Sequence, residues 1–327
     1  MSASENRVAS IGSLLFQSTG GNGVYARTGL FEQVMEALSA LITRERQADA
    51  EVLRFPPVVS RHLIEKSGYL HSFPHFLGFV SCLHNGPEAA LDSSHLQPTD
   101  LVLTPAACYP LYPLVAARGA VPEQGLVFDV CSYCFRREVS ENLDRLQTFQ
   151  MREYVCIGTA EQAIAFRTQW MARAQELAQE LKLPYQIAPA TDPFFGKAGK
   201  LLAMSQIEQS LKFELLVPVL SEEKPTACMS FNCHRDHFGK TWGMQTAGGE
   251  LAHTACVAFG LDRLALALFA THGPKLETWP AALKTLLRSD NNRTTSGRRV
   301  QNGPEAINMK AAEWKVGSDA HRNDRRP

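Results

Sequence analysis

A charged hairpin in the middle of the chain carries the residues best suited to hold an anionic substrate. Residues 126–139 (LVFDVCSYCFRREV) and 148–158 (TFQMREYVCIG) have the β-branched, aromatic and cysteine content of strands, and a polar turn joins them. Arg136 and Glu138 stand where the first strand ends. Arginine can bind a phosphate through two parallel hydrogen bonds, and glutamate can accept from an amine or orient the arginine. Such a pair also stabilises ordinary hairpins, so both roles stay open for these residues alone.

Cysteine and histidine offer candidate metal ligands. Cys131-x-x-Cys134 is half of a zinc knuckle, without a second CxxC to complete a structural site. Residues 131 and 134 also face opposite sides of an ideal strand, which argues against joint ligation. Cys233-His234-x-x-His237 is denser in soft ligands and is a second candidate. In a cytoplasmic protein we expect free thiols or metal ligands rather than disulfides among the scattered cysteines 82, 108, 131, 134, 156, 228, 233 and 256.

The elements before the hairpin suit a dimerisation unit. Residues 29–44 have the apolar spacing of a helix with one broad apolar face. The run VLRFPPVVSR at 52–61 predicts a strand interrupted by Pro56-Pro57, which places it at a sheet edge or an interface.

Two helices are predicted after the hairpin. Residues 160–182 form the clearest helical pattern, with Thr159 as its N-cap. Residues 253–273 predict a strand that runs through Gly260 into an apolar helix. Arg263 would then lie just inside the helix N-terminus, where backbone N–H groups favour an anion. Between these helices, TDPFFGKAGK (191–200) is predicted to be a loop.

Composition limits the functional classes. The chain has 327 residues, of which 45% are hydrophobic and 20% charged, as in a globular protein. The formal net charge is zero and the pI is near 7.1, so no overall field draws the protein to nucleic acid or a membrane. The sequence shows no apolar run near the roughly 20 residues of a membrane span and no signal-peptide core, so we expect a cytoplasmic protein.

The chain divides into a flexible lead at 1–22, one catalytic domain at 23–289 and a mobile polar tail at 290–327. The order of elements lacks the regular strand–helix alternation of a doubly wound fold. Neither GxGxxG nor GxxxxGK[ST] occurs, so the two usual nucleotide-binding loops are absent from the sequence.

Two separated stretches resemble one family. FRRE (135–138) with TFQMRE (148–153) resembles the second signature motif of class II aminoacyl-tRNA synthetases, and CVAFGLDRLALALF (256–269) resembles the third. The helix at 29–44 followed by RFPPV is similar to the first motif, which forms the dimer interface in that family. The resemblance covers roughly residues 25–275. It implies an α+β fold with a central antiparallel sheet flanked by helices, and a homodimer.

A subgroup of that family fits the chain better than the synthetases themselves. No coiled-coil arm or basic tRNA-binding domain is recognisable. Through RFPPV, EKSGYLHSFP, DPFFG, SFNC-x-x-DHFG and AFGLDR the chain resembles the amino acid:[carrier protein] ligases, small relatives of the zinc-dependent seryl-tRNA synthetases of methanogens. These enzymes adenylate glycine or alanine with ATP and pass it to the phosphopantetheine thiol of a small carrier protein. A seryl-like tRNA synthetase and a non-catalytic regulatory paralogue are the alternatives, and the neutral charge counts against a tRNA substrate.

The resemblance implies an ATP site on the hairpin. Arg136 would hold the α-phosphate and the attacking carboxylate, and Glu138 would accept from the adenine amino group. Phe149 would stack on one adenine face and Arg263 would cover the other. Arg152 would reach the phosphates, or instead pair with Glu153 or a nearby acid.

The resemblance also implies metals. A Mg²⁺ ion would accompany ATP, but its usual acidic ligand aligns near Thr226, so no residue is assigned to it. A zinc ion held by Cys, Glu and Cys would leave one position for the substrate amino group. The matching residues are Cys131, Glu176 and Cys256.

The amino acid and the carrier protein complete the expected partners. By resemblance, Glu214, Ser230 and Asn232 line the amino-acid pocket, with glycine as the first choice of substrate and alanine as the second. A carrier protein should be acidic, so its docking surface should be basic. The candidates are the Arg136–Arg152 hairpin and the Arg167–Arg173 helix face.

Overall fold

The computed structural model describes residues 11–83 and 95–288, which all belong to one compact unit spanning residues 1–289. The predicted tail at 290–327 and the first ten residues of the predicted lead lie outside the described residues. Within the described ranges, no helix is long and apolar enough to cross a membrane.

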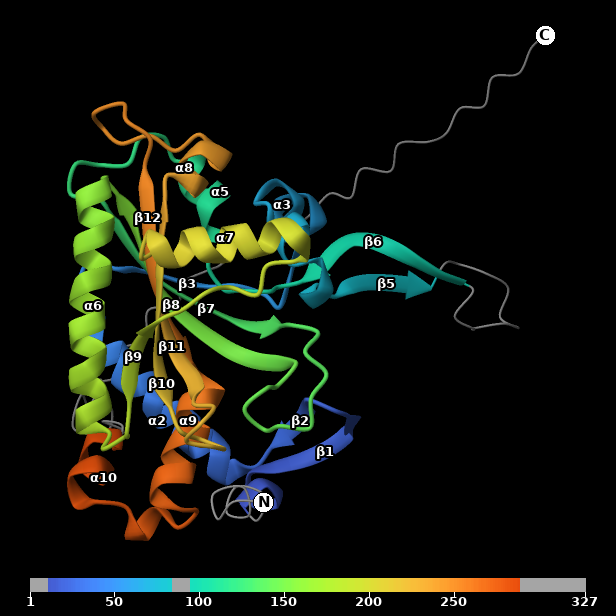
Figure 1. The fold of residues 1–327 in the computed structure, drawn as a ribbon, viewed down its shortest axis with the longest axis vertical. Coiled ribbons are helices and arrows are strands. Elements are labelled where there is room, and N and C mark those ends of the chain that lie inside the picture. The colour runs from blue at the N-terminus through green and yellow to red at the C-terminus, as the bar shows by residue number, and fades with distance from the viewer. Residues whose placement is uncertain (1–10, 84–94, 289–327) are drawn as a thin grey trace, which may run out of the picture. The chain divides into compact units, whose positions relative to one another are not determined.

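A seven-stranded sheet forms the centre of this unit (Figure 1), with the order β3-β7-β8-β12-β11-β10-β9. Every neighbouring pair is antiparallel except β3 and β7, which are parallel. The predicted central antiparallel sheet is therefore confirmed, with one parallel strand at its edge. Its strands are β3 (Glu51–Arg54), β7 (Leu126–Phe135), β8 (Thr148–Gly158), β9 (Gln186–Pro189), β10 (Lys212–Val217), β11 (Thr226–Arg235) and β12 (His253–Gly260).

Helices cover the sheet because its strands bury side chains on both faces. The helices with described bounds are α2 (Gly29–Glu45), α3 (Arg61–Lys66), α4 (Tyr69–Ser72), α5 (Leu111–Ala116), α6 (Ala160–Glu180), α7 (Gly196–Glu208), α8 (His237–Trp242), α9 (Leu261–His272) and α10 (Ala281–Leu287). Short 3-10 turns lie at Pro74–Phe76 and Leu276–Thr278.

One face of the sheet, which we call the helix face, packs on α2, α6 and α9. Trp170 of α6 lies edge-on to Phe259 of β12, with 5.8 Å between ring centroids, and packs on Tyr154 of β8 at 4.9 Å. The predicted start of α6 is confirmed, since Thr159 and Gln162 form a reciprocal capping box. This large apolar core fixes β8, β11 and β12 relative to one another.

The opposite face packs on α5 and α8 around a second core, and we call it the site face. It is the face that carries Glu153, Asn232 and Cys256. A three-stranded sheet of β4 (Val58–Ser60), β6 (Leu96–Leu103) and β5 (Phe79–Leu83) adjoins α3 and α4 in a third core. Between β3 and β4 the chain passes through Pro56-Pro57, so the predicted edge position of this interrupted strand is confirmed.

Two expectations about local structure are wrong. The predicted lead at 1–22 is structured from residue 11 onward: residues 11–15 are helical, and β1 (Phe16–Gly21) pairs with β2 (Val24–Arg27). Leu15 and Phe16 are buried, which holds this segment in the main core. The predicted loop at 191–200 extends only to Phe195, because α7 begins at Gly196.

Candidate active site

Four of the predicted site residues meet on the site face. In the strand register Ser230 pairs with Glu214, and Asn232 pairs with Cys256, so the four side chains share one face. Asn232 Nδ2 lies 3.3 Å from both Cys256 Sγ and Ser230 Oγ. The structure therefore brings the predicted amino-acid pocket next to one of the predicted metal ligands.

Arg136 and Phe149 lie together at another part of the same face. Phe149 is four residues from Glu153 along β8, which puts both on the site face. The guanidinium carbon of Arg136 is 5.6 Å from the Phe149 ring centroid, and Arg136 Nε donates to the Pro105 carbonyl at 3.1 Å. In such a pair the Arg136 cation can bind a phosphate, and the Phe149 ring can stack on an adenine.

Glu138 and Arg263 are both engaged with the turn between β7 and β8. Glu138 accepts a hydrogen bond from Arg145 at 2.9 Å. Arg263, in the first turn of α9, donates through Nε to the Asp144 carbonyl at 2.8 Å and through Nη1 to the Ala227 carbonyl at 3.2 Å. This arrangement holds the Arg263 guanidinium beside the turn that follows Arg136.

Asp144 was not singled out by the sequence. Its Oδ2 accepts from Thr226 Oγ1 at 2.7 Å, and its Oδ1 is buried with no hydrogen-bond partner among the described residues. A buried carboxylate oxygen without a partner costs free energy unless a cation or a donor from a ligand meets it.

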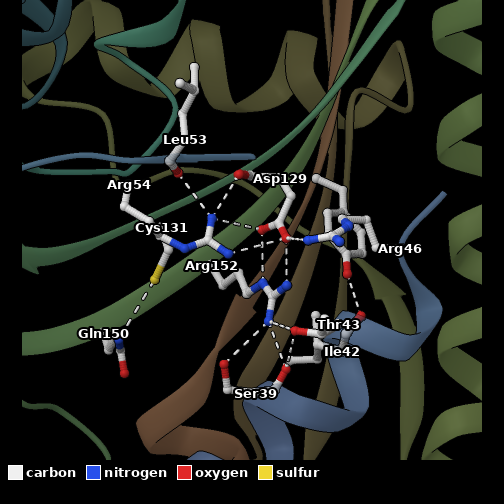
Figure 2. A network of polar contacts seen from close by, with 11 residues as sticks. Ser39, Ile42, Thr43, Arg46, Leu53, Arg54, Asp129, Cys131, Gln150 and Arg152 are labelled. Atoms are coloured by element: carbon white, nitrogen blue, oxygen red, sulfur yellow. Dashed lines mark hydrogen bonds and ion pairs between the residues drawn. The ribbon is translucent and has the colours of Figure 1, made fainter. Parts of the chain in front are cut away.

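The prediction that Arg152 reaches the phosphates is wrong, because Arg152 lies on the helix face (Figure 2). It is 1% exposed, and its guanidinium holds both carboxylate oxygens of Asp129. Its Nη1 donates to the Ser39 carbonyl at 2.7 Å and to Thr43 Oγ1 at 2.8 Å, both on α2. The alternative of pairing with a nearby acid is confirmed, with Asp129 as that acid.

Asp129 is the centre of a structural network that Figure 2 shows. Arg46 and Arg54 also ion-pair with its carboxylate, at 3.3 and 3.1 Å. Burial opposes the charge on Asp129, but hydrogen bonds from Arg152 and Arg54 lower its pKa below the usual value. This network ties the hairpin to α2 and to the edge strand β3.

The predicted zinc ligands Cys131, Glu176 and Cys256 do not come together. Cys131 pairs with Arg152 on the helix face, whereas Cys256 pairs with Val155 on the site face. Glu176 lies on α6, is 62% exposed through its side chain, and ion-pairs with Arg173 at 2.9 Å. The alternation of β7 also puts Cys131 and Cys134 on opposite faces, so the expectation for that pair is confirmed.

A different set of two thiols and a carboxyl gathers around Cys256. The backbone N–H of Cys108 donates to Glu153 Oε1 at 3.0 Å. The Cys108, Glu153 and Cys256 side chains lie close enough to shift one another's pKa. Within residues 11–83 and 95–288, no group of three or more His, Cys, Asp or Glu residues is placed so that it could hold a metal ion. The donor types, S, O and S, nevertheless match the set expected for zinc.

Burial sets the protonation of this cluster. It raises the pKa of Glu153 above its usual range. The pKa of Cys108 is raised well above its usual value by its hydrogen bond to Cys256 and by burial. Without a cation, three negative charges here would be costly, and a divalent metal would remove that cost.

The second metal candidate, Cys233-His234-x-x-His237, is also separated. His234 Nδ1 lies 2.9 Å from Thr254 Oγ1 and its Nε2 lies 3.8 Å from Cys256 Sγ. His237 Nε2 contacts the Ser67 carbonyl at 3.2 Å instead. Burial and the nearby His237 lower the pKa of His234 to about 4, so its ring is neutral at pH 7. His234 thus borders the Cys256 cluster rather than forming a site with its sequence neighbours.

The predicted basic docking surfaces are mostly unsuitable. Arg152 is buried, and Arg173 ion-pairs with three carboxylates, those of Glu45, Glu176 and Glu180. An apolar surface is more prominent. Helix α7 exposes large side chains at one-turn spacing, with Leu201 at 70%, Met204 at 59% and Ile207 at 50%.

Proteins with similar sequences were found. The chain is 57% identical over 285 residues to amino acid–[acyl-carrier-protein] ligase 1 of Bradyrhizobium diazoefficiens, which covers 84% of this chain and 87% of the relative. It is 56% identical to ligase 2 of the same organism, over 84% of this chain and 85% of that relative. It is 28% identical to the type-2 serine–tRNA ligase of Methanopyrus kandleri, covering 77% of this chain and 53% of that enzyme.

Solved structures share the fold. The M. kandleri seryl-tRNA synthetase bound to A. aeolicus tRNASec matches with a TM-score of 0.72 and 22% identity, over 94% of this chain and 63% of that one. The Pyrococcus horikoshii seryl-tRNA synthetase complexed with ATP matches with a TM-score of 0.59 and 18% identity, over 82% and 56%. The expected class II catalytic fold is confirmed. No protein-family model matches the chain.

Proposed function

The chain belongs to the amino acid–[acyl-carrier-protein] ligases, and on that premise we propose that it adenylates glycine, or else alanine, and transfers it to a phosphopantetheine thiol. The carboxylate of the amino acid attacks the α-phosphate of ATP, and pyrophosphate leaves. The thiol then attacks the activated carbonyl carbon and loses its proton, and AMP leaves with the bonding electrons. The product is an aminoacyl thioester on the carrier protein.

The observation that supports this reaction is that two of the predicted ATP residues, Arg136 and Phe149, share one sheet face with the predicted amino-acid residues. Arg136 and Phe149 lie at the hairpin end, while Asn232 and Cys256 lie further along the same face. Catalysis of this reaction depends on positioning and charge neutralisation rather than on a covalent nucleophile. In this proposal Arg136 offsets the charge that develops on the α-phosphate, while the adenine stacks on Phe149.

Zinc fits the Cys108, Glu153 and Cys256 side chains better than the trio predicted from sequence. Two buried thiols and a buried carboxyl that shift one another's pKa suit a borderline-soft cation. When bound, zinc supplies a Lewis-acid contact to the free amino group of the substrate. Asn232, which donates to Cys256, would act as an outer support for that thiolate.

Magnesium has a candidate ligand in Asp144. Its buried Oδ1 faces no hydrogen-bond partner among the described residues, and carboxylate oxygen is the donor that Mg²⁺ prefers. Asp144 also lies next to Arg263, whose guanidinium is assigned to the adenine. One carboxylate together with phosphate oxygens and water is a common set for this ion.

The substrate is expected to be small. Glycine and alanine differ by one methyl group, which is worth about 1–3 kcal/mol of discrimination, so some cross-activation is expected. Ser230, Asn232 and Glu214 would contact the bound amino acid, since they share the face of Cys256.

The carrier protein would dock on the exposed apolar side chains of α7. Leu201, Met204 and Ile207 lie on one helix, and large exposed apolar groups at such spacing mark a protein-binding surface. Figure 1 shows α7 crossing in front of the sheet. A carrier bound there would need only its flexible phosphopantetheine arm to reach the site face.

A homodimer is also proposed. Strand β3 is the sheet edge, and Val52 on it is 43% exposed. An uncovered edge strand beside α2 is a surface that a second copy can cover. Sedimentation analysis would measure the mass, and a monomer at micromolar concentration would contradict this part.

Transfer assays separate the proposed function from its alternatives. Labelled glycine or alanine with ATP is offered to a holo-carrier protein, the same carrier without its phosphopantetheine arm, and tRNA. We expect label on the holo-carrier alone, as a bond that hydroxylamine cleaves. Label on tRNA would favour a synthetase, and no label on any acceptor, with no AMP formed, would favour a regulatory paralogue.

A further inference from the structure

A chain of polar contacts links α7 to the amino-acid end of the site face. Lys212, the first residue of β10, ion-pairs with Asp192 and, at 3.2 Å, with Glu214. The Lys212 side chain is only 11% exposed, so its ammonium depends on these carboxylates rather than on water. Lys212 pairs with Asn232 in the strand register, which puts it in the row of Asn232 and Cys256.

Asp192 is itself held by α7. Gln206 Nε2 donates to Asp192 Oδ2 at 2.8 Å, and the Asp192 backbone N–H donates to Gln206 Oε1 at 2.7 Å. This reciprocal contact fixes both the position and the orientation of the Asp192 carboxylate. The contacts therefore run from Gln206 through Asp192 and Lys212 to Glu214.

Asp192 and Lys212 each favour the ionised form of the other. Burial opposes the charge on Asp192, but Lys212 lowers the Asp192 pKa, with smaller help from Gln206 and Arg136. Burial also opposes the charge on Lys212, but Asp192 and Glu214 raise the Lys212 pKa. Loss of the ammonium would leave two carboxylates facing each other in a half-buried site, where like charges repel strongly.

We infer that Lys212 is a positioning residue for amino-acid binding, which holds Glu214 beside Ser230 and depends on Asp192 and Gln206 for its own position. This inference rests on the proposed function, because it assigns a support to the amino-acid end of that same site. Without Lys212, Glu214 turns away from Asp192 and loses its fixed place at the pocket. Among the described residues Arg136 forms no ion pair with Asp192, and it acts on Asp192 and Lys212 only through its charge. We therefore expect the ATP end, built on Arg136 and Phe149, to be less affected.

The test compares Lys212→Met with the charge-keeping Lys212→Arg. Amino-acid-dependent exchange of pyrophosphate into ATP is measured while the amino acid and ATP are varied separately. We expect Lys212→Met to raise the KM for the amino acid about tenfold or more and to change the KM for ATP less than about twofold. Lys212→Arg should recover most of the loss. Lys240→Met is the matched control, because Lys240 forms an exposed ion pair with Asp236.

A graded series adds a readout that simple destabilisation would not give. Asp192→Asn and Gln206→Leu should also raise the KM for the amino acid. The rise should be largest for Lys212→Met, smaller for Asp192→Asn and smallest for Gln206→Leu. An unchanged amino-acid KM in a folded Lys212→Met protein would overturn the inference, as would equal rises in both KM values. If none of the amino acids supports exchange of pyrophosphate into ATP by the unaltered protein, the proposed function itself fails. That outcome differs from a failure of the inference about Lys212 alone.

Discussion

The backbone N–H of Cys108 donates a 3.0 Å hydrogen bond to the carboxylate of Glu153, a residue 45 positions further along the chain. Cys108 lies in the loop between β6 and α5, whereas Glu153 lies in the middle of β8. The contact holds Cys108, which lies in an irregular segment, next to the part of the sheet where Cys256 also lies. It is the relationship on which the proposed zinc site depends.

Zinc retention should show which of two cysteines, Cys108 or Cys131, is a zinc ligand. Cys108→Ser should lower zinc affinity at least about tenfold, because a ligand is lost from the cluster around Cys256. Cys131→Ser should keep zinc, because Cys131 lies on the helix face beside Gln150. Metal content of the purified proteins measures both, with circular dichroism to confirm folding. Loss of zinc from Cys131→Ser with retention in Cys108→Ser would contradict the assignment.

The Arg152 network should matter for stability rather than for ATP binding. Arg152→Met should lower the free energy of unfolding by about 3 kcal/mol, because it removes one partner of a buried ion pair and the hydrogen bonds from Arg152 to Ser39 and Thr43 on α2. Denaturant unfolding measures this change. Arg61→Met is the control, because Arg61 and Glu65 form an exposed pair worth less than about 1 kcal/mol. A normal stability together with a raised KM for ATP would restore the phosphate-binding role.

Acid stability should depend on Asp129. The pKa of Asp129 in the folded protein lies below the usual value for an aspartate, so its stabilising contribution is present above the pKa of the unfolded state and is lost as pH falls through the folded pKa. Asp129→Asn should therefore be less stable than the unaltered protein at pH 7, and the difference should shrink in acid. Unfolding free energies at several pH values test this. A difference that stays constant down to the lowest pH measured would argue against a charged Asp129.

Carrier docking on α7 predicts a selective defect. Replacing Leu201 and Met204 together with serine should raise the KM for the holo-carrier about tenfold, since exposed apolar anchors at an interface are lost. Amino-acid-dependent pyrophosphate exchange should stay unchanged, because it needs no carrier. Ile164→Ser is the matched control, because Ile164 is 51% exposed on α6. A normal carrier KM in the double variant would exclude this surface.

Much of the scaffold could be predicted from local sequence patterns. The motifs on the hairpin and at Gly260 placed β7, β8 and α9, and the apolar spacing placed α2 and α6 to within two residues. Strand alternation also placed Cys131 and Cys134 on opposite faces. These features follow from short-range periodicity, which the sequence displays directly.

The metal ligands could not be predicted in this way. Cys108 reaches Glu153 through a loop, and loop paths leave no periodic signal. Glu153 did offer a signal. Adjacent residues of a strand face opposite sides of the sheet, so an Arg152 that pairs with a buried acid on one face places Glu153 on the other face. Helix α7 was missed because it starts at a glycine, contains Gly199 and turns its apolar residues outward, so its pattern does not resemble a core-facing helix.

The most direct test of the account is exchange of pyrophosphate into ATP across the twenty amino acids, with and without prior removal of metal by a chelator and reloading with zinc. The proposed function predicts exchange with glycine or alanine, its loss on chelation, and its recovery with zinc in the unaltered protein but not in Cys108→Ser. Absence of exchange with every amino acid in a folded, zinc-loaded protein would contradict it.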